Sequence, residues 1–208
     1  MRPSLTAACL LVATVLASRA RAQESVDAPR VAGYLALAVG GDADFDSDPG
    51  GSTSSSLDAT IGFGVRGELP VHQFVVLAAS FELMTFETNG SFSSAREEVL
   101  NFDAWIRGRY PFELTRDLWL EPYVAVPIGF SLGLIPVGGE DEAWPGWNVG
   151  VLGGAALILG NLPLAFFFEL GWRFHQVFYD QNVPILGNID YKLTTNQLAM
   201  QGGAALHF

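Results

Sequence analysis

The most constraining feature of this chain is a two-residue alternation that recurs along its length. Over residues 57–69 the odd-numbered positions are mostly apolar, whereas the even-numbered ones are Asp, Thr, Gly, Arg and Glu. The same period marks residues 100–112, 118–132 and 164–174. Because successive side chains of a β-strand point to opposite faces, this period predicts strands with one apolar face.

Four weaker segments complete the pattern, at residues 31–39, 75–83, 147–159 and 194–208. The register of residues 147–159 stays open, because that segment is rich in Gly and Ala. The chain is therefore predicted to be all-β, with eight strands.

The connections between these segments alternate in length. Short links are expected at residues 70–72, 111–117 and 160–163, and long loops at residues 40–56, 86–98, 133–146 and 176–192. Short turns at one end and long loops at the other are typical of a transmembrane β-barrel. The sequence thus predicts an eight-stranded antiparallel up-and-down transmembrane β-barrel.

The N-terminus has the pattern of a secretory signal peptide. Arg2 precedes an apolar run over residues 5–17, and Ala20-Arg21-Ala22 is a small-x-small cleavage pattern. The run is shorter than the roughly 20 residues of a spanning helix. We expect a cleaved signal peptide over residues 1–22, a short periplasmic segment over residues 23–30, and the barrel over residues 31–208.

The distribution of charge favours a membrane barrel over a soluble one. The mean hydropathy is +0.29 although the net charge is −11, and the apolar faces of the expected strands carry no charge. An Arg or Lys that faces lipid at mid-depth costs about 2–4 kcal/mol. The narrow interior of an eight-stranded barrel suits small residues and a few long ones. The apolar faces are therefore expected to face lipid.

The end of the chain adds an aromatic terminal strand, with Met200, Ala204, Leu206 and Phe208 on one face. Together with the signal peptide, strand count and loop asymmetry, this strand resembles the small eight-stranded outer-membrane barrels of Gram-negative bacteria, of the OmpA-like and OmpX-like type. The resemblance implies that these four residues form the signal read by the outer-membrane insertion machinery. It also implies contact with outer-membrane lipid and lipopolysaccharide, periplasmic termini, extracellular long loops and a monomer.

The inward register collects most mid-strand charges. We interpret them as a salt-bridge network in the lumen, because a buried charge without a partner is costly; an ion pathway is the alternative. Arg107 and Glu121 are expected to face each other, with Glu169 at the same level. The set is Arg66, Glu68, Glu82, Asp103, Arg107, Arg109, Glu121, Glu169, Arg173 and His175.

The first long loop carries four acids at alternate positions, which are Asp42, Asp44, Asp46 and Asp48. Carboxylate oxygens suit Ca²⁺. A helix–loop–helix calcium loop, however, requires Gly at its sixth position and Glu at its twelfth, where this chain has Ser47 and Thr53. The four acids are thus weak metal candidates in a solvated loop, and no cofactor is expected.

The expected function is a structural or surface-interaction role without catalysis. A narrow pore for ions or very small solutes is the first alternative, and a lipid A-modifying enzyme is the second. His175 lies at the height expected for such an enzyme, but its register points into the lumen and no Ser follows it closely. Nucleic acid is excluded as a partner, because the chain contains a single Lys and no basic patch.

Overall fold

The computed structural model describes residues 26–48, 50–57, 59–86, 97–137, 140–183 and 187–208. The expected signal peptide lies outside these residues. Within them, no helix is both long and apolar enough to cross a membrane. The described strands are β1 (Arg30–Asp48), β2 (Gly51–Ser56), β3 (Thr60–His72), β4 (Val75–Phe86), β5 (Glu97–Arg109), β6 (Phe112–Thr115), β7 (Leu118–Val137), β8 (Glu140–Leu159), β9 (Leu164–Val183) and β10 (Gly187–His207).

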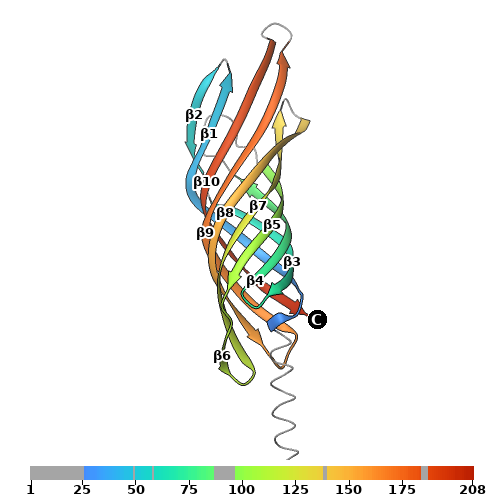
Figure 1. The fold of residues 1–208 in the computed structure, drawn as a ribbon. Coiled ribbons are helices and arrows are strands. Elements are labelled where there is room, and N and C mark those ends of the chain that lie inside the picture. The colour runs from blue at the N-terminus through green and yellow to red at the C-terminus, as the bar shows by residue number, and fades with distance from the viewer. Residues whose placement is uncertain (1–25, 49, 58, 87–96, 138–139, 184–186) are drawn as a thin grey trace, which may run out of the picture.

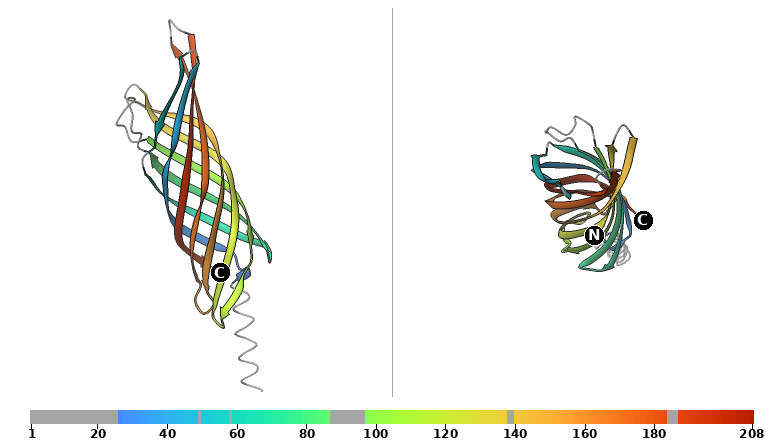
Figure 2. Two further views of the ribbon diagram at one scale, coloured as in Figure 1. Left: turned by 90° about the vertical axis from the view of Figure 1, so that its left-hand side faces the viewer. Right: turned by 90° about the horizontal axis from the view of Figure 1, so that it is seen from above.

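Eight of these strands form a closed antiparallel ring (Figure 1). Their order is β10-β9-β8-β7-β5-β4-β3-β1, and β1 pairs with β10 to close the ring. The two remaining strands extend it, because β2 pairs with β1 beyond the ring and β6 pairs with β7. The predicted all-β, eight-stranded antiparallel barrel is confirmed. Its strands are strongly tilted, and several hairpins project from the end opposite the C-terminus (Figure 2).

Burial alternates along the strands and is inverted relative to a soluble protein. On β3 every second residue from Thr60 to Glu68 is buried, including Arg66, while Phe63 and Val65 are exposed. The buried face is the lumen, and the exposed face is the outer wall. The register that the sequence left open on β8 is resolved in the same way: Asn148, Leu152, Ala156 and Ile158 face inward, whereas Trp147 and Val151 face outward.

Three of the four expected long loops are largely strand. β1 continues to Asp48 and pairs with both β10 and β2, and the β7–β8 and β9–β10 hairpins fill most of the other two. The expectation of loops was wrong because strands had been recognised only where a regular apolar face marks them. These extensions lie beyond the apolar wall, so backbone pairing continues without that alternation. Residues 87–96 of the fourth loop lie outside the described residues.

The short connection predicted at residues 111–117 is also partly strand. β6 pairs with the start of β7, with Phe112 opposite Leu120. The turn is thereby reduced to the residues between Thr115 and Leu118. This hairpin carries the wall past the neighbouring strand ends at the lower edge of Figure 1.

A bulge in β1 changes which residues face the lumen. The register with β10 shifts between Val39 and Asp42, across Gly40 and Gly41, whose φ angles are 63° and 96°. Such positive φ values suit glycine. The bulge is one place where the sequence prediction fails: Leu57 was assigned to the outer face, but its N–H donates to the Gly41 carbonyl at 3.1 Å and its side chain is buried.

Glycines on the inner face leave room for long polar side chains. Gly129 lies directly opposite Asp103, and a Cβ atom added there would lie 2.2 Å from Asp103 Oδ1 and 2.3 Å from the Phe102 carbonyl oxygen. Gly154 similarly accommodates Glu169. The long polar side chains of the inner face therefore fit into the narrow lumen only because glycines stand opposite them.

We expect Gly129→Ala to lower the free energy of unfolding by about 1–3 kcal/mol, because the new methyl group overpacks the lumen. Gly67→Ala is the matched control: an added Cβ there meets nothing within 4 Å, so the change should stay within about 0.5 kcal/mol. Urea unfolding of the refolded barrel measures both. Equal effects of the two substitutions would contradict this account of the inner face.

Candidate functional site

All ten residues of the predicted lumen set are buried on the inner face of the ring. Ion pairs divide its arginines and carboxylates into two networks along the barrel axis. The lower network, near the chain ends in Figure 1, consists of Asp27, Arg30, Arg66, Glu68, Arg107, Arg109, Glu121, Tyr123 and Glu169. The upper network consists of Glu82, Asn101, Asp103, Ser131, Asn148, Arg173 and Gln201.

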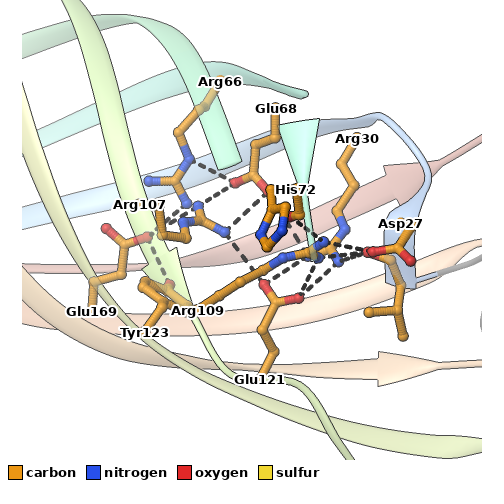
Figure 3. A network of polar contacts seen from close by, with 11 residues as sticks. Asp27, Arg30, Arg66, Glu68, His72, Arg107, Arg109, Glu121, Tyr123 and Glu169 are labelled. Carbon is orange, nitrogen blue, oxygen red and sulfur yellow. Dashed lines mark hydrogen bonds and ion pairs between the residues drawn. The ribbon is translucent and has the colours of Figure 1, made fainter. Parts of the chain in front are cut away.

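Glu121 is the acceptor that joins three strands in the lower network (Figure 3). Arg30 Nη2 and Arg109 Nη1 lie 3.0 Å and 2.9 Å from its Oε2. Arg107 Nη1 lies 3.7 Å from its Oε1. The structure therefore brings Arg107 and Glu121 together, from the two strands that flank one connection. Arg30 was not anticipated, because it immediately precedes the segment in which the alternation begins.

Two further carboxylates complete this network. Arg66 donates to Glu68 Oε1 at 2.9 Å and to Glu169 Oε1 at 2.6 Å. The Tyr123 hydroxyl also donates to Glu169 Oε1, at 2.8 Å. Arg107 Nη2 lies 4.0 Å from the same oxygen, so Glu169 shares the level of the other groups.

The segment before β1 enters the lower end of the lumen. Val26 is buried, and its carbonyl accepts hydrogen bonds from Arg30 Nη2 at 2.8 Å and Arg109 Nη1 at 2.6 Å. Asp27 Oδ1 accepts from Arg109 Nη2 at 2.7 Å. Four guanidinium groups in this network thus meet four carboxylates, the fourth being that of half-exposed Asp27.

An aromatic layer lies next to the lower network. The guanidinium of Arg66 lies 4.8 Å from the ring centroid of Trp105 and 4.6 Å from that of Phe167. Tyr34 packs edge-on against Phe167. Stacking on aromatic faces stabilises a guanidinium that is removed from water. Trp105 Nε1 donates in turn to Ser80, which contacts Asp103 of the upper network.

The upper network is centred on Arg173. Its Nη1 donates to Glu82 and its Nη2 donates to Asp103 Oδ2 at 2.7 Å. Asn148 Nδ2 donates to Asp103 Oδ1 at 2.8 Å and to Ser131 at 3.0 Å. These contacts connect strands β4, β5, β7, β8 and β9 across the lumen.

Apolar side chains occupy the lumen above the upper network. One cluster contains Ala38, Ala43, Leu57, Met84 and Val99, with Leu193 packed against it. A second cluster pairs Trp144 with Val177, and Phe45, Tyr191 and Leu193 pack against it. The lumen therefore changes from charged to apolar toward the projecting hairpins. His175, buried on β9, stands opposite Thr195 and Asn148 in the register, near this change.

The four weak metal candidates are not brought together. Asp42, Asp44, Asp46 and Asp48 all lie on β1, where alternate residues are separated by about 6–7 Å along the strand. Asp46 Oδ2 instead lies 3.4 Å from Lys192 Nζ. Among the described residues, no group of three or more His, Cys, Asp or Glu side chains is arranged to hold a metal ion.

The four residues of the expected insertion signal lie on β10 and at the residue after it. Leu206 and Phe208 are exposed on the outer wall, and Met200 and Ala204 are partly exposed on the same face. The inward positions between them include Gln201 and Ala205, which are buried.

Sequence reasoning missed the neutral members of the networks. Tyr123, Asn101, Ser131 and Gln201 have the inward register, but only charged residues were selected from it. The same alternation contains the signal that would have found them: a buried amide or hydroxyl on a charged face requires a partner. Asn148 could not be assigned to the inner face, because the sequence did not determine the register of residues 147–159.

Comparisons with known proteins identify the fold. The chain matches neither a protein-family model nor a curated protein sequence. The outer membrane protein OprG from Pseudomonas aeruginosa aligns with a TM-score of 0.54 and 11% identity over 86% of this chain and 95% of that one. Neisserial surface protein A aligns with a TM-score of 0.46 and 15% identity, over 86% and 97% of the two chains. Ail, the attachment invasion locus protein of Yersinia pestis, gives 0.33 and 9%, over 83% and 99%.

The inverted wall, the eight-stranded ring and the charged lumen are those of a transmembrane β-barrel. The chain has the fold of the small outer-membrane β-barrels of Gram-negative bacteria, and the likeness to OprG covers nearly all of both chains. At this identity the likeness concerns the fold alone.

We expect Glu121→Gln to lower the free energy of unfolding by about 3–5 kcal/mol, because it leaves buried Arg30 and Arg109 without their shared carboxylate. Glu113→Gln is the matched control: Glu113 is exposed on β6, and its effect should stay within about 0.5 kcal/mol. Denaturant unfolding in detergent or lipid measures both. A loss below about 1 kcal/mol for Glu121→Gln would show that the network contributes little.

Proposed function

We propose that this protein is a bacterial outer-membrane β-barrel with a structural or surface-interaction role and no catalytic activity. The observation that carries the proposal is the inverted distribution of apolar and charged side chains across the barrel wall. The outer face exposes Leu35, Phe63, Val124, Ile128 and Phe168, whereas the buried charges are on the inner face. In water such a wall would be an aggregation surface, and in lipid it is the expected one.

The lengths of the strands support an orientation. β10 has 21 residues, which corresponds to about 70 Å of extended chain. The apolar band of such barrels is about 25 Å tall, so even a tilted strand of this length extends well beyond it. We place the projecting hairpins outside the cell, and both chain ends on the periplasmic side with the short turns.

The hairpins offer the surface for interaction. Those formed by β1–β2 and β9–β10 border an open groove of about 560 Å³, lined by Asp46, Ser52, Phe178, Tyr191, Lys192 and neighbouring residues. Binding residues are concentrated in such connecting regions, which a rigid scaffold positions. We therefore assign any contact with lipopolysaccharide or another surface to these hairpins, in a monomeric barrel.

The position of His175 argues against a lipid-modifying enzyme. Its side chain is buried within the lumen, whereas a lipid substrate would lie against the outer wall. A nucleophile and a base must lie within hydrogen-bond reach of each other and of the substrate. The barrel wall itself separates His175 from lipid.

The occupied lumen argues against a pore. Ion pairs cross it at two levels, and apolar clusters lie at one end. Val26 and its hydrogen bonds to Arg30 and Arg109 lie at the other. Eight strands leave an interior that side chains can fill. A narrow pore is the alternative function that this packing disfavours.

The membrane position predicts a depth-dependent response to charge. Val65→Arg, midway along β3 on the outer face, should destabilise the barrel by about 2–4 kcal/mol in a bilayer, because the guanidinium faces hydrocarbon. Val71→Arg, which is comparably exposed but beside the β3–β4 turn, is the matched control and should cost at most about 1 kcal/mol. Denaturant titration in lipid vesicles measures both. Equal costs would contradict a membrane-embedded wall.

The filled lumen predicts no stable conductance. The purified mature barrel in planar bilayers should show no discrete current steps, because the lumen is occupied at two levels. Heat-modifiable gel mobility of the same sample verifies that it is folded. Discrete steps that change with Arg107→Gln, but not with the exposed control Glu113→Gln, would instead establish the pore.

A further inference from the structure

The upper network contains more negative than positive charge. Glu82 and Asp103 are both buried, and Arg173 is the cation that pairs with them in the described part of the chain. The lower network is different, because its four guanidinium groups meet four carboxylates when Asp27 is included. One excess carboxylate charge therefore remains within a largely dehydrated section of the lumen, where an uncompensated charge is costly.

The four carboxylate oxygens already accept N–H hydrogen bonds. Glu82 Oε1 accepts from Arg173 and from Asn101 at 3.2 Å, and Glu82 Oε2 accepts from Gln201 at 3.0 Å. The two oxygens of Asp103 accept from Asn148 and Arg173. These donors orient both side chains but leave the excess charge in place, since Asn and Gln amides are neutral.

A polar atom beside this site has no partner. Gln201 is 1% exposed, and its Nε2 binds Glu82 while its Oε1 forms no hydrogen bond. The two atoms belong to one planar amide, so the hydrogen bond of Nε2 to Glu82 keeps Oε1 in the neighbourhood of that carboxylate. A buried carbonyl oxygen without a donor is costly, and here it lies beside a carboxylate that needs positive charge.

We propose that the upper network binds one small monovalent cation of the sodium class, held by the Glu82 carboxylate and Gln201 Oε1, with the charge of Asp103 contributing to its affinity. A single positive charge neutralises the excess and occupies the unused acceptor. Hard oxygen ligands of this kind suit alkali and alkaline-earth ions. The net charge of the site favours a monovalent ion over a divalent one.

A cation fits these contacts better than a proton does. A proton on Glu82 could use Gln201 Oε1 as its acceptor only if the amide turned and gave up its N–H hydrogen bond to Glu82. A proton on Asp103 Oδ2 would displace the Ser80 hydroxyl, which donates to that oxygen. A cation uses the second lone pair of an oxygen that already accepts one hydrogen bond, so the donors stay in place. The site therefore takes a cation without rearranging Arg173 or Asn148.

The test is the thermal stability of the full mature barrel, refolded in detergent, in sodium chloride and in tetramethylammonium chloride at equal ionic strength. Tetramethylammonium is too large to enter the site. The wild-type midpoint should be about 3–6 °C higher in sodium when the ion is at ten times its Kd. Equilibrium dialysis with radioactive sodium should give one bound ion per barrel.

Two variants locate the site. Asp103→Asn removes the excess charge and should abolish both the difference in midpoint and the bound ion. Gln201→Met keeps both carboxylates and should raise the half-saturating sodium concentration about tenfold. The matched control, Glu113→Gln, removes an equal charge from exposed β6 and should behave like the wild type.

The outcomes separate this proposal from the barrel assignment. Equal wild-type midpoints in both salts, with no bound sodium, would overturn the cation site, and the excess charge would then be neutralised by a proton. A sodium effect that persists in both Asp103→Asn and Gln201→Met would also overturn it, because the ion would then bind elsewhere. Heat-modifiable mobility, measured in the same samples, reports on the barrel fold independently.

Discussion

Five arginines and five carboxylates are buried inside this barrel, and the requirement that they meet one another shapes everything around them. Arg66 reaches Glu169, and Arg30 reaches Glu121, although each pair is separated by about half the chain. Such contacts form only when the sheet closes on itself, because the partners lie on strands that are not neighbours. Buried ion pairs add little stability compared with apolar packing. Breaking one is costly, so the pairing disfavours other registers and incomplete closure.

The outer wall and the inner face place opposite demands on the same strands. Lipid accepts large apolar side chains without close packing between them, whereas the lumen must fit Arg and Glu side chains into a narrow space. Inward glycines such as Gly129 and Gly154 provide the space, because they have no side chain where a long polar side chain lies opposite. Aromatic rings such as Trp105 and Phe167 cover the guanidinium of Arg66 where no carboxylate can. A period-two sequence thus specifies two chemically different surfaces with one backbone.

The sequence was sufficient to predict the ring and the inward direction of its charges, because alternation is a local signal that survives wherever one face meets lipid. It was insufficient in the extensions of β1, β7, β8, β9 and β10, which lie beyond the lipid-facing wall. Their outer face is no longer apolar, and scattered buried residues such as Trp144 and Val177 do not make a regular alternation, so these segments resembled loops. Leu57 was misplaced because it precedes β3 and does not continue its alternation; its N–H instead pairs with Gly41 in the bulge of β1. The pairing of Arg30 with Glu121 depends on closure across the barrel, which no local pattern encodes.

The long hairpins change how a surface contact of this protein would work. A flexible loop must be ordered when it binds, and that loss of entropy weakens the complex. Hairpins that continue the barrel strands are already ordered by their backbone hydrogen bonds. The described part of the β9–β10 hairpin is thus a stiff extension of the wall, in which backbone pairing runs as far as Val183 and Gly187. The length and rigidity of this hairpin, rather than an ability to change shape, would then determine which molecules at the cell surface it can bind.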